Sequence, residues 1–320
     1  MVKTNVHFPT DYNLLWDAAR KCIEISRCLA KTQNLEGWRK ALDWKKRVKA
    51  AFRKLQKTKR SGGKNKGFRL KYATDNYLGT AKMLQKKVVG FQAGFTPKTL
   101  SQELTFAELK YYFEMLGKHI DLVERRLIKG EKIPHSEKLF SLFEPHTKWI
   151  SKGKAGVIAE FGEKHLIVTD QNNFIILNQI IADTPDAAFA IDIAKQLKNQ
   201  FGNRIASLSF DKGFSSKEII EDLESIIPNA IIKQKGKPTK ERKEIEGTEN
   251  FKTLNSAHNA VGSNINQLTY HGLDKCCDKG KINFNKYVSL AVLSYNLHGL
   301  GSLVKKDIEK KRTKKQQKVA

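Results

Sequence analysis

The chain has 320 residues, of which 59 are Lys or Arg and 33 are Asp or Glu, so its formal net charge at pH 7 is +26. A hydrophobic fraction of 40% supplies material for a core and excludes a chain that is disordered throughout. So large a positive charge favours an anionic partner, nucleic acid first and a membrane surface second, and no apolar run approaches the roughly 20 residues that span a bilayer.

The first segment, residues 1–8, has the pattern of an extended strand. Val2, Thr4 and Val6 alternate with polar neighbours, as in a half-buried strand. Because this strand starts at the second residue, we interpret it as the remaining end of a longer core strand. Residues 9–135 then follow a helical period and form a basic helical insertion. Helices are predicted over residues 13–31, 38–55 and 101–130.

The segment 45–87 of this insertion is strongly basic. It holds sixteen Lys or Arg and one acid, with interleaved aromatic residues and a flexible glycine-containing loop at 61–67. Such a run is often only a solvated face, but its one-sided charge favours contact with phosphates. The residues predicted to contact nucleic acid here are Lys64, Lys66, Arg69 and Lys71.

From residue 136 the period changes, and residues 136–303 alternate strands with helices. Strands are predicted over residues 157–161, 165–169, 174–181, 205–210 and 230–233. Helices are predicted over residues 186–200, 215–223, 240–255, 257–268 and 284–300. Ser215 and Glu218 have the spacing of a capping box. The segment 304–320 is basic without an apolar face, which predicts a disordered tail.

This order of elements is a strand, a helical block, a hairpin, and then alternating strands and helices. It predicts an α/β fold with a mixed sheet covered by helices. The ribonuclease-H-like fold has this order when a large helical insertion follows its first strand, and it is the fold that we predict. The strand that ends at Asp211 should then lie centrally, with residues 2–7 paired beside it.

Asp211 is the strongest single candidate for chemistry, because it ends the apolar strand 205–210 just before a helix. Ligands of open α/β sheets bind beyond the strand ends, where a carboxylate suits a divalent metal ion. The alternative is that Asp211 only caps the turn. Two-metal phosphoryl transfer needs several convergent acids, yet helix 257–268 has none and the first strand has none before Asp11.

Four stretches of the sequence stand out as motifs. In chain order they are TNVHFPTD at 4–11 with LLWD at 14–17, FEPHTKWISKGK at 143–154, SFDKGF at 209–214, and HNAV at 258–261 with IN at 265–266 and HGLD at 271–274. Together they resemble the motifs of a DDE transposase of bacterial insertion sequences, in the ISNCY-like group. The resemblance extends from the first residues to about residue 301.

This resemblance implies a ribonuclease-H-like core, two divalent ions (Mg²⁺ or Mn²⁺), and cleavage and strand transfer at the ends of the element. The family's middle catalytic Asp falls on Asp211. His258 falls on a position that is often basic and faces the site, the alternative being a histidine of the core or of a helix cap. Lys152, Lys154 and Lys212 lie in or beside the matching stretches and are predicted to contact DNA.

Two catalytic acids of the family have no counterpart in the sequence. The first catalytic Asp is expected upstream of Thr4, and the catalytic Glu is expected where the chain has Gly262. The resemblance therefore predicts a truncated and inactive transposase, in which an acid such as Asp11 would have to replace a missing ligand. We expect DNA as the partner and no contact with a membrane. The oligomeric state that we consider is a homodimer.

Two other functions are open at this level. One is a non-catalytic, basic DNA-binding protein derived from a transposase, and the other is an unrelated RNA-binding protein. An RNA-binding sheet needs aromatic residues on its strands, and the predicted strands offer only Phe174 and Phe210. The four cysteines lack zinc spacing and indicate the reduced thiols of a cytoplasmic protein. The family resemblance further implies a bacterial, nucleoid-associated protein.

Overall fold

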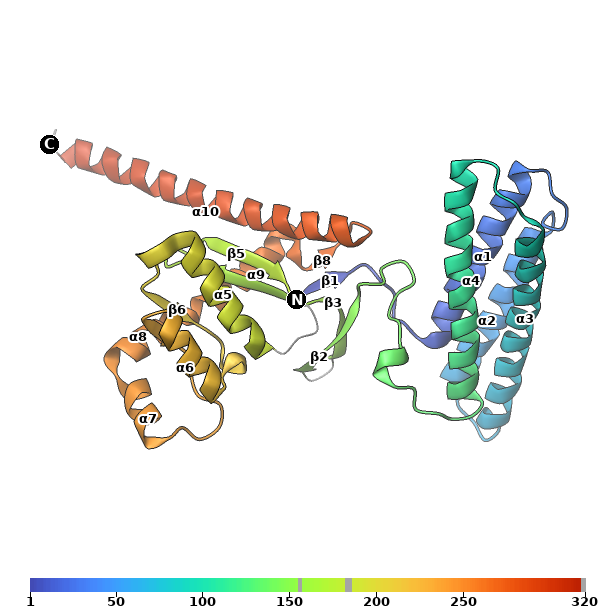
Figure 1. Cartoon of the computed structure of the whole chain (residues 1–320), viewed down its shortest axis with the longest axis horizontal. Helices are drawn as coiled ribbons and strands as arrows, with labels where there is room; N and C mark the ends of the chain where they lie inside the picture. The colour runs from blue at the N-terminus through green and yellow to red at the C-terminus, as the bar shows by residue number, and fades with distance from the viewer. Residues whose placement is uncertain (155–156, 182–185, 318–320) are drawn as a thin grey trace. The chain divides into compact units, whose positions relative to one another are not determined.

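The computed structural model describes residues 1–154, 157–181 and 186–317, without the side chains of residues 152–154, 157–158, 186–188, 217 and 314–317. The chain divides into two compact units, both drawn in Figure 1. The helical unit is Val6–Trp149, and the mixed unit joins Met1–Asn5 to Ile150–Ala320.

The helical unit, which is described throughout, is a bundle of four long helices that lie side by side in Figure 1. They are α1 (Asp11–Thr32), α2 (Ala41–Arg60), α3 (Lys66–Gly94) and α4 (Leu100–Leu127), followed by the short 3-10 helix η1 (His135–Glu137). Thr10 and Thr99 cap α1 and α4, because their side chains accept hydrogen bonds from backbone N–H groups of the first turn. The three predicted helices of this region are confirmed, with shifted ends.

Helix α3 is not among the predicted elements, because its many lysines obscure its apolar face. One row of its buried residues nevertheless recurs at spacings of three or four, and this row is Ala73, Tyr77, Ala81, Leu84 and Val88. The loop predicted at 61–67 is shorter than expected, since α3 already begins at Lys66.

One apolar core fills the bundle. Helix α1 packs against α2 and α4, and α3 packs against α2 and α4. The rings of Trp16 and Phe52 stack with their centroids 5.9 Å apart. Tyr77 is fully buried, and its hydroxyl donates a hydrogen bond of 3.1 Å to the backbone oxygen of Tyr12. Burial of these large side chains is the main stabilising contribution to the unit.

The described strands of the mixed unit form three separate sheets (Figure 1). The first has the order β2-β3-β1-β8, with β2 at Lys148–Lys154, β3 at Val157–Glu163, β1 at Val2–Thr4 and β8 at Lys275–Cys276. The second is the antiparallel hairpin of β4 (His165–Thr169) and β5 (Ile175–Ile180). The third is the parallel pair of β6 (Ser207–Ser209) and β7 (Asn229–Ile231). The chain is therefore a mixed α/β protein with both parallel and antiparallel pairs.

Six α-helices accompany these sheets in the described part of the mixed unit. They are α5 (Asp186–Phe201), α6 (Lys217–Ile226), α7 (Lys240–Gly247), α8 (Glu249–His258), α9 (Ala260–Leu268) and α10 (Lys281–Gln317). One apolar cluster joins α5 and α6 to β6 and β7, and a second joins β1 and β5 to α9 and α10. No described helix is long and apolar enough to cross a membrane.

The predicted position of the first strand is wrong. Strand β1 pairs antiparallel with β3 and parallel with β8, and it does not pair with β6. Gly162 in β3 allows this pairing, because a Cβ atom there would lie 2.1 Å from the backbone oxygen of Val2. Lys3 then joins β1 to the β8 side through an ion pair of 2.7 Å with Asp274. The single ribonuclease-H-like sheet that the element order predicts is not present among the described strands.

Two further predictions need correction. Residues 304–317 are not disordered but continue α10, since the segment is rich in the good helix formers Lys, Glu, Gln and Arg and carries an i,i+4 ion pair between Asp307 and Lys311. Helix α6 is capped by Ser216, whose hydroxyl accepts from the N–H of Ile219, and not by Ser215. Ser215 instead ends the preceding 3-10 turn.

Candidate functional site

Asp211 lies two residues after β6, at the start of the short 3-10 turn Lys212–Phe214. Its carboxylate accepts a hydrogen bond of 2.7 Å from the backbone N–H of Lys212, and its side chain is exposed. The backbone N–H of Phe214 bonds the carbonyl of Asp211 at 3.0 Å and holds the turn in place. Asp211 therefore caps the turn, which was the alternative to metal binding. Its side chain remains exposed to solvent.

His258, at the end of α8, lies beside the strand that leads to Asp211. Its Nδ1 atom is 3.1 Å from the hydroxyl of Ser209, and α8 packs on β6 and β7. Ser209 and Asp211 are two positions apart, a spacing at which side chains of an extended chain share one face. His258 therefore lies on the Asp211 side of β6, half-buried and hydrogen-bonded.

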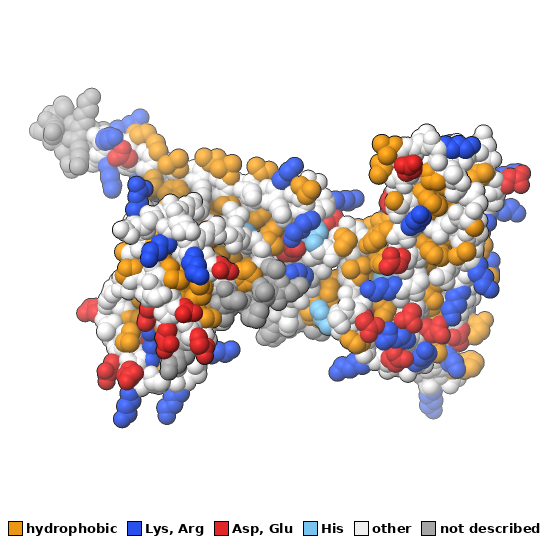
Figure 2. All heavy atoms as spheres, viewed as in Figure 1, with side chains coloured by type: hydrophobic (Ala, Val, Ile, Leu, Met, Phe, Trp, Pro, Cys, Tyr) orange, Lys and Arg blue, Asp and Glu red, His pale blue; other side chains and the backbone are white. Residues whose placement is uncertain are grey.

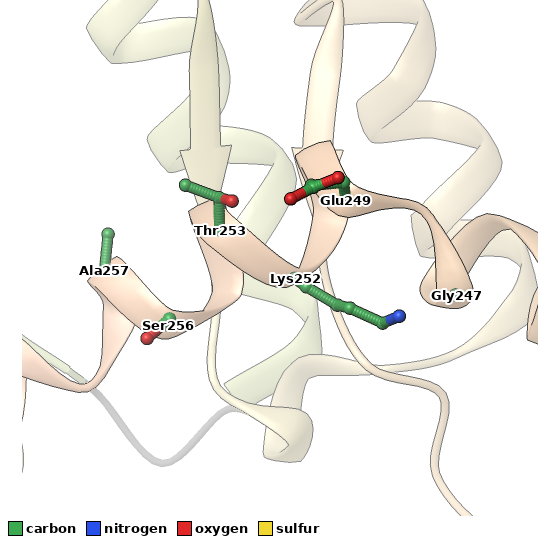
Figure 3. Close-up of a pocket in the computed structure, with 6 residues that line it drawn as sticks. All are labelled: Gly247, Glu249, Lys252, Thr253, Ser256 and Ala257. Atoms are coloured by element: carbon green, nitrogen blue, oxygen red, sulfur yellow. The ribbon is translucent and has the colours of Figure 1, made fainter.

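A hollow of about 770 Å³ lies along the same helix, lined by Gly247, Glu249, Lys252, Thr253, Ser256 and Ala257. Figure 3 shows that these residues come from α8 and from the end of α7. Glu249 belongs to the first turn of α8 and is exposed. The lining thus offers one carboxylate and one ammonium group, which is a polar surface and not a cluster of acids.

Gly262 occupies the first half of α9, and a Cβ atom at this position would meet nothing within 4 Å. A Cβ atom fits there without displacing a neighbour. Two residues on, the amide of Asn264 donates a hydrogen bond of 3.0 Å to the side-chain oxygen of Asn173 in the β4–β5 turn. Tyr295 of α10 donates to the backbone oxygen of Asn173 at 3.0 Å. This link between α9, α10 and the hairpin was not predicted.

The predicted nucleic-acid contacts of the helical unit gather at one end of the bundle. We call this surface the basic tip; it consists of Lys54, Lys64, Lys66, Phe68, Arg69, Lys71 and Tyr72, all exposed. Phe68 and Tyr72 expose 77% and 60% of their surfaces, one helical turn apart on α3. The ammonium group of Lys54 lies 4.9 Å from the centre of the Tyr72 ring. Cations thus surround two aromatic side chains that the protein core does not cover.

The other predicted contacts lie in the mixed unit. Lys212 is exposed next to Asp211, while Lys152 and Lys154 belong to β2 and their side chains lie outside the described residues. On the face drawn in Figure 2, Lys and Arg side chains occur over both units.

A family model described as a transposase DDE domain matches residues 126–297. The chain belongs to this family. The comparison with curated proteins and the comparison with solved structures return no match.

The DDE domain begins within α4 and ends within α10, so it contains Asp211, His258 and Gly262, whereas the basic tip lies outside it. The DDE assignment confirms the resemblance at the level of the family. Assignment to the ISNCY-like group remains a prediction, as do the roles of the individual site residues.

The divalent ions implied by the DDE family need several oxygen ligands around one point. Within the described residues, no group of three or more His, Cys, Asp or Glu side chains lies close enough together to hold a metal ion. The carboxylate of Asp211 is engaged with its own turn, and α9 presents Gly262 where the family resemblance places a glutamate. The described side chains therefore do not fit a two-metal centre.

Asp11, the predicted substitute ligand, is held inside the helical unit. It begins α1 and is almost completely buried, and its carboxylate forms an ion pair of 2.7 Å with the guanidinium of Arg126. Burial raises the pKa of Asp11, and the positive charge of Arg126 opposes that rise. These contacts give Asp11 a structural role in joining α1 to α4, and its role as a metal ligand stays a prediction.

Proposed function

We propose that this member of the transposase DDE family binds DNA and that its own capacity for metal-dependent cleavage and strand transfer at element ends is lost or severely reduced. The observation that supports the loss is the set of side chains around Asp211. Among the described residues, two other acidic side chains do not lie close enough to this carboxylate to form a metal site with it. Gly262 occupies the position at which the family resemblance places the glutamate.

Cleavage is tested with supercoiled plasmid that carries the element's ends, in the presence of Mg²⁺ or Mn²⁺. We expect no nicking above background, and Asp211→Asn should behave like the unchanged chain. Strong nicking that Asp211→Asn abolishes would overturn the proposal and would show that another acid, such as Asp11, completes the site.

Metal binding gives an independent measurement. With one exposed carboxylate as its main ligand, the chain should bind Mg²⁺ weakly in calorimetry, with a dissociation constant of about 1 mM or above. Tight binding that disappears in Asp211→Asn would mean that a ligand has been overlooked.

Repair of the site is a stricter test of the same proposal. Gly262→Glu alone should not restore nicking, because one added carboxylate beside Asp211 leaves the two-metal site without its third acid, which the family resemblance places on the first strand. Nicking should return only when Gly262→Glu is combined with an extension upstream of Met1 that supplies a strand with an Asp. Nicking by Gly262→Glu alone would contradict the inferred need for that first acid.

The basic tip supports the DNA-binding half of the proposal. Four of its cations, Lys64, Lys66, Arg69 and Lys71, are exposed within two turns of helix and loop, which allows several phosphates to be neutralised together. Each phosphate contact contributes about 0.9 to the slope of log affinity against log salt. Replacement of all four by Ala should therefore flatten the slope by about 3 to 4.

The matched control for this test replaces Lys98, Lys110, Lys118 and Lys132 by Ala. These residues carry the same charge in the same unit but lie away from the tip in the sequence, in or beside α4. Equal losses in the two variants would mean that binding depends only on total charge and would contradict a role for the tip.

We also propose that the chain acts as a homodimer.

A further inference from the structure

The basic tip carries positive charge that its own chain does not neutralise. Residues 54–72 contain eight Lys or Arg and no Asp or Glu. None of these eight cations forms an ion pair with another residue that the structure describes. Because charges of one sign repel one another, an anionic ligand would stabilise this surface.

Two aromatic rings of the tip are not explained by the fold. Phe68 and Tyr72 are exposed, and neither belongs to the apolar core of the bundle. Tyr77, five residues after Tyr72 on α3, shows the contrast, since it is fully buried and its hydroxyl bonds the backbone of Tyr12. A ring that stays in water contributes little to stability through burial, so a role in folding does not account for Phe68 and Tyr72.

The two rings lie on one side of α3, because residues four apart are neighbours on a helix surface, with Cβ atoms about 6 Å apart. Helix α2 packs beside α3, and Figure 1 shows the two side by side. From α2, Lys54 places its ammonium group 4.9 Å from the centre of the Tyr72 ring. Arg69 donates a hydrogen bond of 2.6 Å to the carbonyl of Gly62 and so fastens the loop to α3. Aromatic faces and cations are thus held together on one surface.

Nucleic acid fits both features of this surface, because it combines phosphates with flat aromatic bases. In a duplex the base faces are covered by the neighbouring base pairs, and a side chain that enters must first separate two of them. A single strand presents its base faces directly, and stacking of bases on aromatic side chains is a main source of its affinity for proteins. The exposed rings therefore favour unpaired bases.

We propose, on the basis of the DNA binding proposed above, that the basic tip binds single-stranded DNA. Unpaired bases stack on Phe68 and Tyr72, while the surrounding cations contact the phosphates. In one strand of a duplex, successive bases are about 3.4 Å apart, which is about half the separation of the two ring positions. A strand without a partner can open to that separation. DNA and not RNA is the ligand, since the chain belongs to the transposase DDE family.

The test compares two strands that carry the same phosphates. The full chain is titrated with an oligothymidylate of about 12 nucleotides and with an abasic strand of the same length, which lacks all bases. We expect the oligothymidylate to bind about tenfold or more tightly, because only this strand can stack on the rings. Equal affinities for the two strands would overturn the proposal.

The double variant Phe68→Leu/Tyr72→Leu assigns the difference to the two rings. Leucine keeps an apolar side chain but has no aromatic face, so binding of oligothymidylate should fall about tenfold or more. Binding of the abasic strand should stay within about twofold. The variant Phe68→Trp/Tyr72→Trp restores aromatic faces and should bind oligothymidylate as the unchanged chain does. An oligothymidylate affinity that is the same in all three proteins would overturn the proposal.

The matched control is Leu100→Ala/Leu104→Ala on α4. These side chains are 71% and 66% exposed, lie four residues apart in the same unit, and are aliphatic. Their removal should leave binding of oligothymidylate within about twofold. A loss as large as that of the leucine variant would mean that any exposed apolar side chain contributes, and it would overturn the role of the rings.

A duplex of the same length separates this proposal from DNA binding as such. The leucine variant should bind the duplex within about threefold of the unchanged chain, because leucine can still enter a base step and no charge is removed. Equal losses on duplex and single strand would overturn the selection of single strands and leave DNA binding in place. Failure to bind either form would overturn both proposals. An RNA strand bound more than about tenfold tighter than the DNA strand would overturn the assignment to DNA.

Discussion

The helical unit and the mixed unit bury their apolar residues in different ways. The four helices of the first share one continuous core, whereas the described residues of the second divide theirs between two clusters and three small sheets. Helices satisfy their backbone hydrogen bonds locally, so a bundle needs only side-chain packing. Strands of two or three residues, such as β6 and β8, depend on neighbours that the chain must bring together.

The same contrast applies to function. The basic tip is formed by side chains close in sequence, on the end of α2, the start of α3 and the loop between them, so one helix–loop–helix segment suffices to assemble it. A two-metal centre needs acids from several distant segments, and the surroundings of Asp211 lack such a group in the described residues. DNA binding can therefore persist when the acids of the two-metal centre are incomplete, whereas metal-dependent cleavage cannot.

The largest expected effect tests whether the two cores are independent. Leu116→Ala removes a fully buried side chain from the helical unit and should destabilise it by about 3 kcal/mol. Trp16, Trp38 and Trp44 lie in or beside α1 and α2, whereas Trp149 belongs to β2. In a Trp149→Phe background the fluorescence therefore reports the unfolding of the helical unit alone, while circular dichroism reports both units. Leu223→Ala, fully buried in the mixed unit, should shift the dichroism and leave the fluorescence transition unchanged.

The control for Leu116→Ala is Leu104→Ala on the same helix, whose side chain is 66% exposed. It should change stability by no more than about 0.5 kcal/mol. If Leu223→Ala moved the fluorescence transition as far as Leu116→Ala does, the two units would unfold together and the comparison would fail.

Both units should be sensitive to acid, because each contains a histidine with a lowered pKa: His119 is fully buried and His165 is half-buried. Burial lowers the pKa of His119 in α4 and of His165 in β4 to about 4 in each case. Since the unfolded pKa is about 6.5, the unfolded state binds the proton first. The stability associated with the neutral ring is complete above pH 6.5 and is lost as the pH falls towards 4, by about 3 kcal/mol for each histidine.

His119→Leu separates the two contributions. It should remove this pH dependence from the fluorescence transition of the helical unit and leave that of the mixed unit in place. The ring nitrogens of His119 have no hydrogen-bond partner among the described residues, so the apolar replacement breaks no such bond. An unchanged slope between pH 4 and 6.5 would assign the acid sensitivity to other groups.

The aromatic part of the basic tip should act differently from its cations. Phe68→Ala is expected to weaken DNA binding by about 1 kcal/mol, since an exposed ring can stack on a base or enter a base step. It should leave the salt slope unchanged, because no charge is removed. Phe8→Ala, at 61% exposure in the same unit, is the control and should have no effect on binding.

The smallest expected effect concerns α9. Gly262→Glu should stabilise the mixed unit by several tenths of a kcal/mol, because Glu is a better helix former than Gly and its Cβ meets no neighbour. Gly262→Ala should stabilise the unit by a similar or slightly larger amount. Destabilisation by both variants, seen in the dichroism transition, would show that this position tolerates only Gly.

The sequence alone predicted the elements whose signals are local. Helices α1, α4 and α5 follow from apolar spacing, the strands of the β4–β5 hairpin follow from the period change, and Asp211 was recognised at the end of its strand. The family resemblance also came from contiguous motifs, and the DDE domain match confirmed it. A local pattern is enough in each case because the interactions involved join residues only a few positions apart.

Only the tertiary structure decided how these elements combine. It paired β1 with β3 and β8 instead of β6, placed His258 against Ser209, and joined Asp11 to Arg126. It also buried one side of α10 and left Leu290, Leu293 and Leu297 exposed, although apolar residues occur on both sides. These features depend on contacts between distant segments, and the choice among distant partners is made by packing and close backbone approach, which no local pattern contains.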